Sequence, residues 1–169
     1  IINCVASLGT ALTESQGRLL KKYFEDIVIA YDSDSAGQKA AIRGLDLLYG
    51  IGCNVKMLEI PKGKDPDDYI KIAGAEGFEK LIGNALPLVE YKIKMYEKDY
   101  DVDSTEGRIR FMEKMYLVLS ELNSRVEMEM YTQKLADHYG VSADSILTEI
   151  MKIRKGNVKK EEIKKAAKM

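Results

Sequence analysis

The sequence predicts an α/β fold, with a partial parallel sheet of about three strands, followed by a small all-α helical bundle. Up to about Ile60, short apolar runs alternate with segments of helical periodicity. This alternation is typical of a parallel sheet with crossover helices. After Pro87 the strand-like runs stop, and apolar residues recur only at helical spacing. The composition, 46% hydrophobic and 31% charged over 169 residues, suits one globular domain or two small ones.

Three short apolar runs are expected to form the strands, at residues 3–6, 27–30 and 54–60. Helices are expected between them, one beginning at Thr13 and one over residues 36–49. Because consecutive strands joined by helices run in the same direction, their carboxyl ends should share one edge of the sheet.

Two helix starts carry capping signals. Thr13-Glu14-Ser15-Gln16 has the Ser/Thr-x-x-Glu/Gln form of a capping box. Asp65 followed by Pro66 predicts an N-cap and the first residue of a third helix.

Four helices are expected in the second half of the chain, two of them capped by Ser104 and Ser142. The second of these helices is expected to bury one face, made of Ile109, Met112, Tyr116 and Leu119. We therefore divide the chain into the C-terminal part of a sheet domain at residues 1–86, a helical bundle at 87–155 and a basic linker or tail at 156–169.

The charge is uneven although the net charge is only −1. From Met151 onward the chain has eight Lys or Arg and two Glu. A solvated, frayed terminus is the favoured interpretation of this basic segment, and a direct nucleic-acid contact is the alternative.

An acidic pair follows the second predicted strand. Asp32 and Asp34 lie two residues apart between that strand and the next helix. The carboxyl edge of a parallel sheet is where open α/β sheets bind ligands, and carboxylates at this spacing suit Mg²⁺. Ordinary turn chemistry is the alternative, because Asp is common in turns.

A second acidic group follows the third predicted strand, at Asp65, Asp67 and Asp68. If the two strands are neighbours, both acidic groups open on one edge, where cations would relieve their mutual repulsion. The structural alternative is that Asp65 only caps the helix and Asp68 only complements the helix dipole.

Four further residues are weaker candidates for phosphate or nucleic-acid contact. Gly9 and Thr10 follow the first predicted strand, and their backbone N–H groups suit a phosphate, although a plain turn is an equal alternative. Lys39 and Arg43 lie one and two helical turns after the acidic pair, where a solvated helix face is the alternative.

Zinc and membrane functions are not indicated. The cysteines Cys4 and Cys53 and the single histidine, His138, lie far apart and form no zinc-ligand pattern. The two cysteines are expected to be buried free thiols, which fits a cytoplasmic protein. No apolar run approaches membrane-spanning length.

Three segments together resemble one protein family. They are Val5-Ala6-Ser7-Leu8-Gly9-Thr10-Ala11-Leu12-Thr13, Ile29-Ala30-Tyr31-Asp32-Ser33-Asp34-Ser35-Ala36-Gly37 and Gly63-Lys64-Asp65-Pro66-Asp67-Asp68. In this order they resemble the Toprim fold of the bacterial replicative DNA primases of the DnaG type. The helical half resembles the subdomain that completes the polymerase core of these primases.

The resemblance implies RNA primer synthesis on a single-stranded DNA template from ribonucleoside triphosphates. By carry-over, Asp32 and Asp34 are the catalytic residues, and together with Asp65 and Asp67 they bind Mg²⁺ or Mn²⁺ in two-metal chemistry. Asp68 is a weaker candidate for the same role.

The resemblance also implies parts that this sequence lacks. The family's Toprim glutamate and its zinc-binding N-terminal module would precede Ile1, and a C-terminal domain for the replicative helicase would follow residue 169. We therefore expect a bacterial, cytoplasmic, replisome-associated parent enzyme and an inactive fragment. The alternatives are a piece of another Toprim enzyme, such as a nuclease or topoisomerase, and a non-catalytic interaction module.

Overall fold

The computed structural model describes residues 3–6, 12–31, 35–61 and 65–166. The chain forms two compact units, Ile1–Tyr91 and Lys92–Met169. The first unit contains the sheet, and the second contains the helices that follow.

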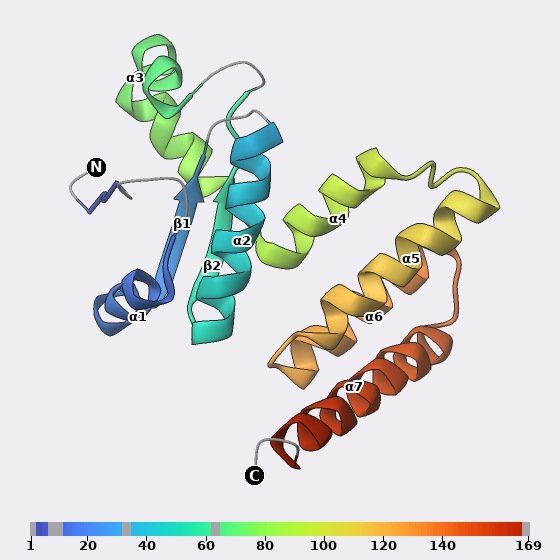
Figure 1. Ribbon diagram of the computed structural model, residues 1–169. Helices are drawn as coiled ribbons and strands as arrows, with labels where there is room; N and C mark the ends of the chain where they lie inside the picture. Colours follow the sequence, from blue (N-terminus) through green and yellow to red (C-terminus); the bar gives the residue numbers. More distant parts are fainter. Residues whose placement is uncertain (1–2, 7–11, 32–34, 62–64, 167–169) are drawn as a thin grey trace. The chain divides into compact units, whose positions relative to one another are not determined.

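The sheet has three strands in the order β1-β2-β3. Strand β1 (Asp26–Ala30) pairs in parallel with β2 (Asn54–Leu58), so that Ala30 lies opposite Leu58 (Figure 1). Strand β3 (Leu86–Pro87) pairs antiparallel with β2. The predicted α/β architecture is confirmed, but the sheet is mixed rather than wholly parallel.

The prediction of a strand at residues 3–6 is wrong. These residues lie outside any strand, and their side chains are exposed, including 73% of Val5. A strand is stabilised by ladder hydrogen bonds and by burial of at least one face, and the described part of the chain gives this segment neither. The third strand of the sheet is instead the short β3.

Two helices pack against different parts of the parallel strands. Helix α2 (Ser35–Ile51) covers one face, where its Leu45 packs with Ile29 and Val55 in one hydrophobic core. Helix α3 (Pro66–Gly83) joins a second, smaller core around Leu58. The connections that follow β1 and β2 lead into these two helices and also carry the acidic residues.

Helix α1 (Glu14–Tyr23) begins with the predicted capping box at Thr13 and packs on α2. Gly17 makes this packing close, because a Cβ atom there would lie 2.6 Å from Leu47 Cδ2 and 2.7 Å from Ile51 Cδ1. A larger residue at this position would force the ends of the Leu47 and Ile51 side chains to move.

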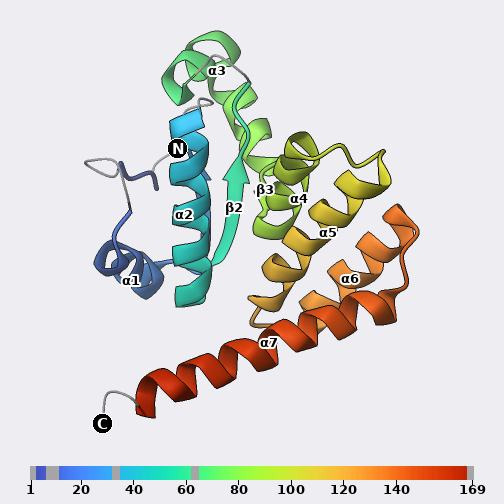
Figure 2. The same cartoon turned by 45° about the vertical axis from the view of Figure 1, so that its right-hand side comes forward.

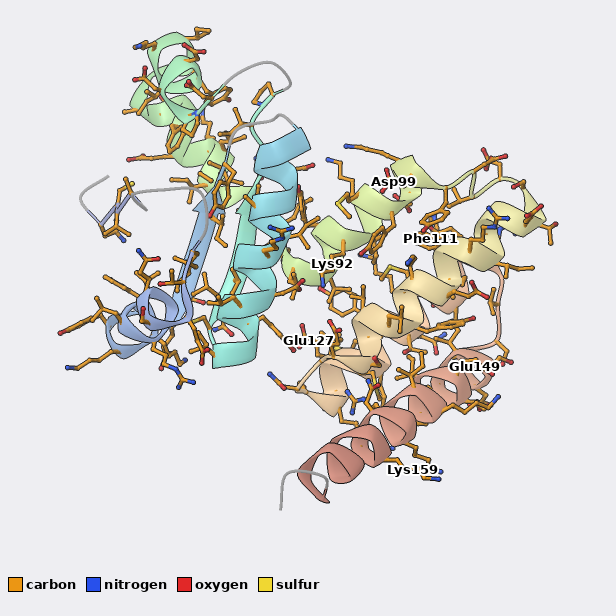
Figure 3. All side chains as sticks on the ribbon, in the orientation of Figure 1. Lys92, Asp99, Phe111, Glu127, Glu149 and Lys159 are labelled. Atoms are coloured by element: carbon orange, nitrogen blue, oxygen red, sulfur yellow. The ribbon has the colours of Figure 1, made fainter. Side chains whose placement is uncertain are left out.

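Helix α4 (Leu88–Asp99) crosses the boundary between the two units, and α5 (Thr105–Ser120), α6 (Arg125–Tyr139) and α7 (Ala143–Ala166) complete the second (Figure 2). Phe111, labelled in Figure 3, is fully buried there, with its ring centroid 4.9 Å from that of Tyr139. The predicted helical half is confirmed.

Two details of the helical half differ from the sequence expectation. Ile109 is 55% exposed, whereas Met112 and Leu119 are buried as predicted. Helix α7 continues to Ala166, although Gly156 suggested that a linker begins there. One glycine costs a helix only about 1 kcal/mol, which neighbouring Lys, Glu and Ala residues of high helix propensity offset. In the part of the chain that the structure describes, no helix is both long and apolar enough to cross a bilayer.

Candidate metal site at the carboxyl edge of the sheet

The carboxyl ends of β1 and β2 lie side by side. Ala30 and Leu58 are the last residues of these parallel strands and are paired partners. Asp32 and Asp34 follow β1 directly but lie outside the described residues, between the end of β1 and the start of α2 at Ser35. The strand pairing therefore brings the starts of both acidic segments to one edge, and the role of this acidic pair stays a prediction.

The second acidic group forms a compact cluster at the start of α3, which lies beyond the arrowheads of β1 and β2 in Figure 1. Asp65, Asp67 and Asp68 each offer a carboxylate oxygen, and these oxygens lie within 4.8 Å of one another. Oxygen-only ligands in this arrangement fit a hard divalent cation such as Mg²⁺ or Mn²⁺. Asp68, which the sequence ranked below the others, is as close to the group as Asp67.

Asp65 caps α3 as predicted. Its Oδ1 accepts a hydrogen bond of 2.7 Å from the backbone N–H of Asp68, and Pro66 is the first helical residue. A carboxylate has two oxygens, so this cap leaves one oxygen of Asp65 for a metal ion. Capping and metal binding are compatible at this residue.

Lys71 is a neighbour of the cluster that the sequence analysis missed. Its Nζ donates to Asp67 Oδ2 in an ion pair one helical turn along α3. This hydrogen bond, together with the charges of Asp67, Asp68 and Asp65, raises the pKa of the Lys71 ammonium above its usual range. The i, i+4 spacing of Asp67 and Lys71 is the sequence signal that indicates such a pair.

The structure does not test the four phosphate candidates. Gly9 and Thr10 lie outside the described residues, and the side chain of Lys39 is not described. Arg43 is exposed on α2, eight residues after its start at Ser35, and therefore about 12 Å along the helix. All four stay predictions.

The two cysteines differ in burial. Cys53 is buried, and burial raises the pKa of its thiol, whereas Cys4 is exposed, so the expectation of two buried thiols is wrong for Cys4. His138 lies on α6 in the other unit. Among the described residues, the aspartate cluster is the group of three or more His, Cys, Asp or Glu side chains that lie close enough to share a metal ion.

We expect the two roles of Asp65 to separate on mutation. Asp65→Ala should destabilise the chain by about 1 kcal/mol through loss of the N-cap, whereas Asp65→Asn should keep most of the stability because Asn also caps helices well. Urea unfolding followed by circular dichroism measures the difference. Equal destabilisation by both changes would show that the cap contributes nothing. Mn²⁺ binding should weaken in both variants, because both remove the negative charge.

Two family models match the chain. One, described as Toprim-like, matches residues 1–70. The other, described as the DnaB-helicase binding domain of primase, matches residues 89–144. The first covers the parallel strands β1 and β2 and the start of α3, and the second covers most of the helical half.

Individual proteins that are similar to this chain are also DNA primases. The DNA primase of Clostridium acetobutylicum is 39% identical over 146 residues, which make up 86% of this chain and 24% of that protein. A solved DNA primase domain from Pseudomonas aeruginosa has a TM-score of 0.70 and 28% identity over 85% of this chain and 46% of the solved one. A solved DnaG primase catalytic domain bound to single-stranded DNA has a TM-score of 0.69 and 26% identity, covering 82% and 45% of the two chains.

The fold and these matches define the first unit as Toprim-like. They define the second as a primase-type helical unit. The chain belongs to the bacterial DNA primases of the DnaG type. It spans about a quarter of the length of the curated relatives that it matches.

The match to a helicase-binding domain changes one expectation. The sequence analysis placed the helicase contact in a C-terminal domain beyond this chain. The family match falls instead on residues 89–144, within this chain. Loose helical periodicity gave no signal for such a match, because a stripe of apolar residues looks the same whether it packs a core or binds a partner.

Proposed function

We propose that this chain is part of the catalytic core of an enzyme that synthesises short RNA primers on single-stranded DNA for DNA replication. The observation that carries the proposal is the parallel pairing of β1 with β2, from whose shared carboxyl edge both acidic segments start. The primase relatives, one of them solved with single-stranded DNA, support the choice of reaction.

In the proposed reaction, the 3′-hydroxyl of the primer attacks the α-phosphate of a ribonucleoside triphosphate, and pyrophosphate leaves. Divalent cations, Mg²⁺ or Mn²⁺, would supply charge stabilisation for the attacking and leaving oxygens. Asp32, Asp34, Asp65 and Asp67 would hold these cations, and Asp68 would support Asp67. Asp65 also fixes the start of α3, so the second pair of carboxylates is positioned by a helix cap rather than by a free loop.

The proposal extends to the partners and the location of the parent enzyme. The helical unit would contact the replicative helicase, as the matched family description suggests. A bacterial, cytoplasmic, replisome-associated enzyme fits this partner. The chain alone is proposed to be inactive, since it spans only about a quarter of the length of its primase relatives. Any zinc would belong to a separate module of the parent protein.

The test is nucleotide incorporation by the full-length protein on a single-stranded DNA template with ribonucleoside triphosphates and Mg²⁺. We expect short RNA products that require the divalent cation, and no products from the 169-residue chain alone. Cleavage of the DNA without incorporation would instead indicate a Toprim nuclease or topoisomerase. Extension of primers by the isolated chain would contradict the claim that its site is incomplete.

A further inference from the structure

The ammonium of Lys71 lies against the aspartate cluster. Its Nζ donates to Oδ2 of Asp67, one of the three residues whose carboxylate oxygens gather within 4.8 Å. Lys71 is on α3, one turn after Asp67, so the pair is held within a single helix. A positive charge therefore already lies beside a carboxylate that a metal ion would use.

We propose that Lys71 is a built-in counter-cation that competes with a divalent metal ion for the Asp67 carboxylate and so sets the cation affinity of the cluster. This inference rests on the proposed function, because it takes the cluster to be a metal site. Lys71 is in this view a tuning residue and not a catalytic one.

Electrostatics gives the competition its direction. Three carboxylates this close repel one another, and the Lys71 ammonium offsets part of that repulsion when no metal ion is bound. A divalent cation bound through the other oxygen of Asp67 would still repel the ammonium, so metal binding weakens the pair and favours its opening. Opening is easy, since the side chain of Lys71 is 66% exposed and exposed ion pairs are weak. Lysine therefore lowers the metal affinity without blocking the site.

The part of α3 that follows the kink at Gly74 offers a matched control. Lys80 pairs with Glu76 at the same i, i+4 spacing, with a distance of 2.8 Å between Nζ and Oε1. Both side chains are at least as exposed as those of the Lys71 pair, and Glu76 is not part of the aspartate cluster. Removing Lys80 changes the helix charge by the same amount but leaves the cluster untouched.

The experiment measures Mn²⁺ binding to the 169-residue chain by electron paramagnetic resonance of the free ion. Removing one unit charge about 4 Å from a bound divalent cation, in a water-like dielectric, should tighten binding in Lys71→Met by up to about thirtyfold. Lys71→Arg should bind Mn²⁺ like the wild type, because it keeps the charge, and Lys80→Met should also leave binding unchanged. Asp67→Asn should weaken binding, and circular dichroism shows whether each variant keeps its helices.

The outcomes separate this inference from the proposed function. If Asp67→Asn weakens Mn²⁺ binding but Lys71→Met binds like the wild type or more weakly, Lys71 does not compete with the metal, and the metal site stands. If Lys80→Met tightens binding as much as Lys71→Met, the effect is general helix charge and the inference is wrong. If Asp67→Asn leaves Mn²⁺ binding unchanged, the cluster is not the metal site, and the proposed function loses its cation assignment.

Discussion

Asp34→Ala in the full-length primase is expected to lower the rate of primer synthesis by at least about a hundredfold, the scale on which removing a preorganised charge-stabilising group acts. Asp34 follows β1, whose carboxyl end is paired with that of β2, and the second acidic cluster follows β2. The carboxylate would act through bound cations on the attacking and leaving oxygens, so its loss should slow the chemical step. Incorporation of labelled ribonucleotides at saturating Mg²⁺ measures the effect, and Asp32→Ala should behave in the same way.

The controls distinguish a lost site from a lost fold. Glu79→Gln removes an exposed acid from α3, outside the aspartate cluster, and should leave synthesis unchanged. In metal-free buffer, the double change of Asp32 and Asp34 to alanine should not lower the Tm and should raise it if the two carboxylates repel. Near-normal synthesis by Asp34→Ala would contradict the assignment of Asp34 as a catalytic residue, and the acidic segments would then be ordinary turns and caps.

Local rules predicted the helix starts well. Thr13 and Asp65 cap their helices as expected, because each cap needs only a side chain and a backbone N–H three residues later. Ser104 does the same for α5. Gly140 ends α6 with a φ of 66°, the left-handed backbone that favours glycine. These features depend on a few neighbouring residues, which the sequence shows directly.

The sheet was predicted less completely, because a strand must pair with another segment and the local sequence does not show which one. The runs at 27–30 and 54–60 overlap β1 and β2. The run at 3–6 is also mostly apolar but is no strand, and β3 has only two residues and no pattern to detect. Propensity measures how well a side chain fits a half-buried pleated surface, not whether such a surface is present.

The contacts that join distant segments were not predictable at all. The Arg154 guanidinium donates from α7 to the backbone carbonyls of Ser120 and Leu122, where α5 ends. The Tyr139 hydroxyl donates to Glu97, 42 residues away, and burial and this carboxylate raise the pKa of Tyr139 above its usual range. The members of the aspartate cluster are sequence neighbours, which is why that part of the site was found. Its relation to Asp32 and Asp34 depends on strand pairing.

Gly107→Ala is expected to destabilise the chain by about 3 kcal/mol, which combines overpacking with partial loss of a helix cap. A Cβ atom on Gly107 would lie 2.0 Å from the carbonyl oxygen of Asp101 and 2.7 Å from its carbonyl carbon. This carbonyl accepts hydrogen bonds from the backbone N–H and the hydroxyl of Ser104, which also caps α5 through the N–H of Gly107. The loop therefore cannot move away from the new methyl group without giving up the cap.

Gly156→Ala is the matched control for this prediction. Gly156 lies in α7, and a Cβ atom there would meet nothing within 4 Å. The same substitution should therefore stabilise the chain by about 0.5–1 kcal/mol, since alanine favours the helix over glycine. Thermal and urea unfolding of both variants, followed by circular dichroism at the helix band, should show shifts of opposite sign. If Gly107→Ala unfolds at the wild-type midpoint, the loop at 101–104 does not close over the start of α5 as the structure describes.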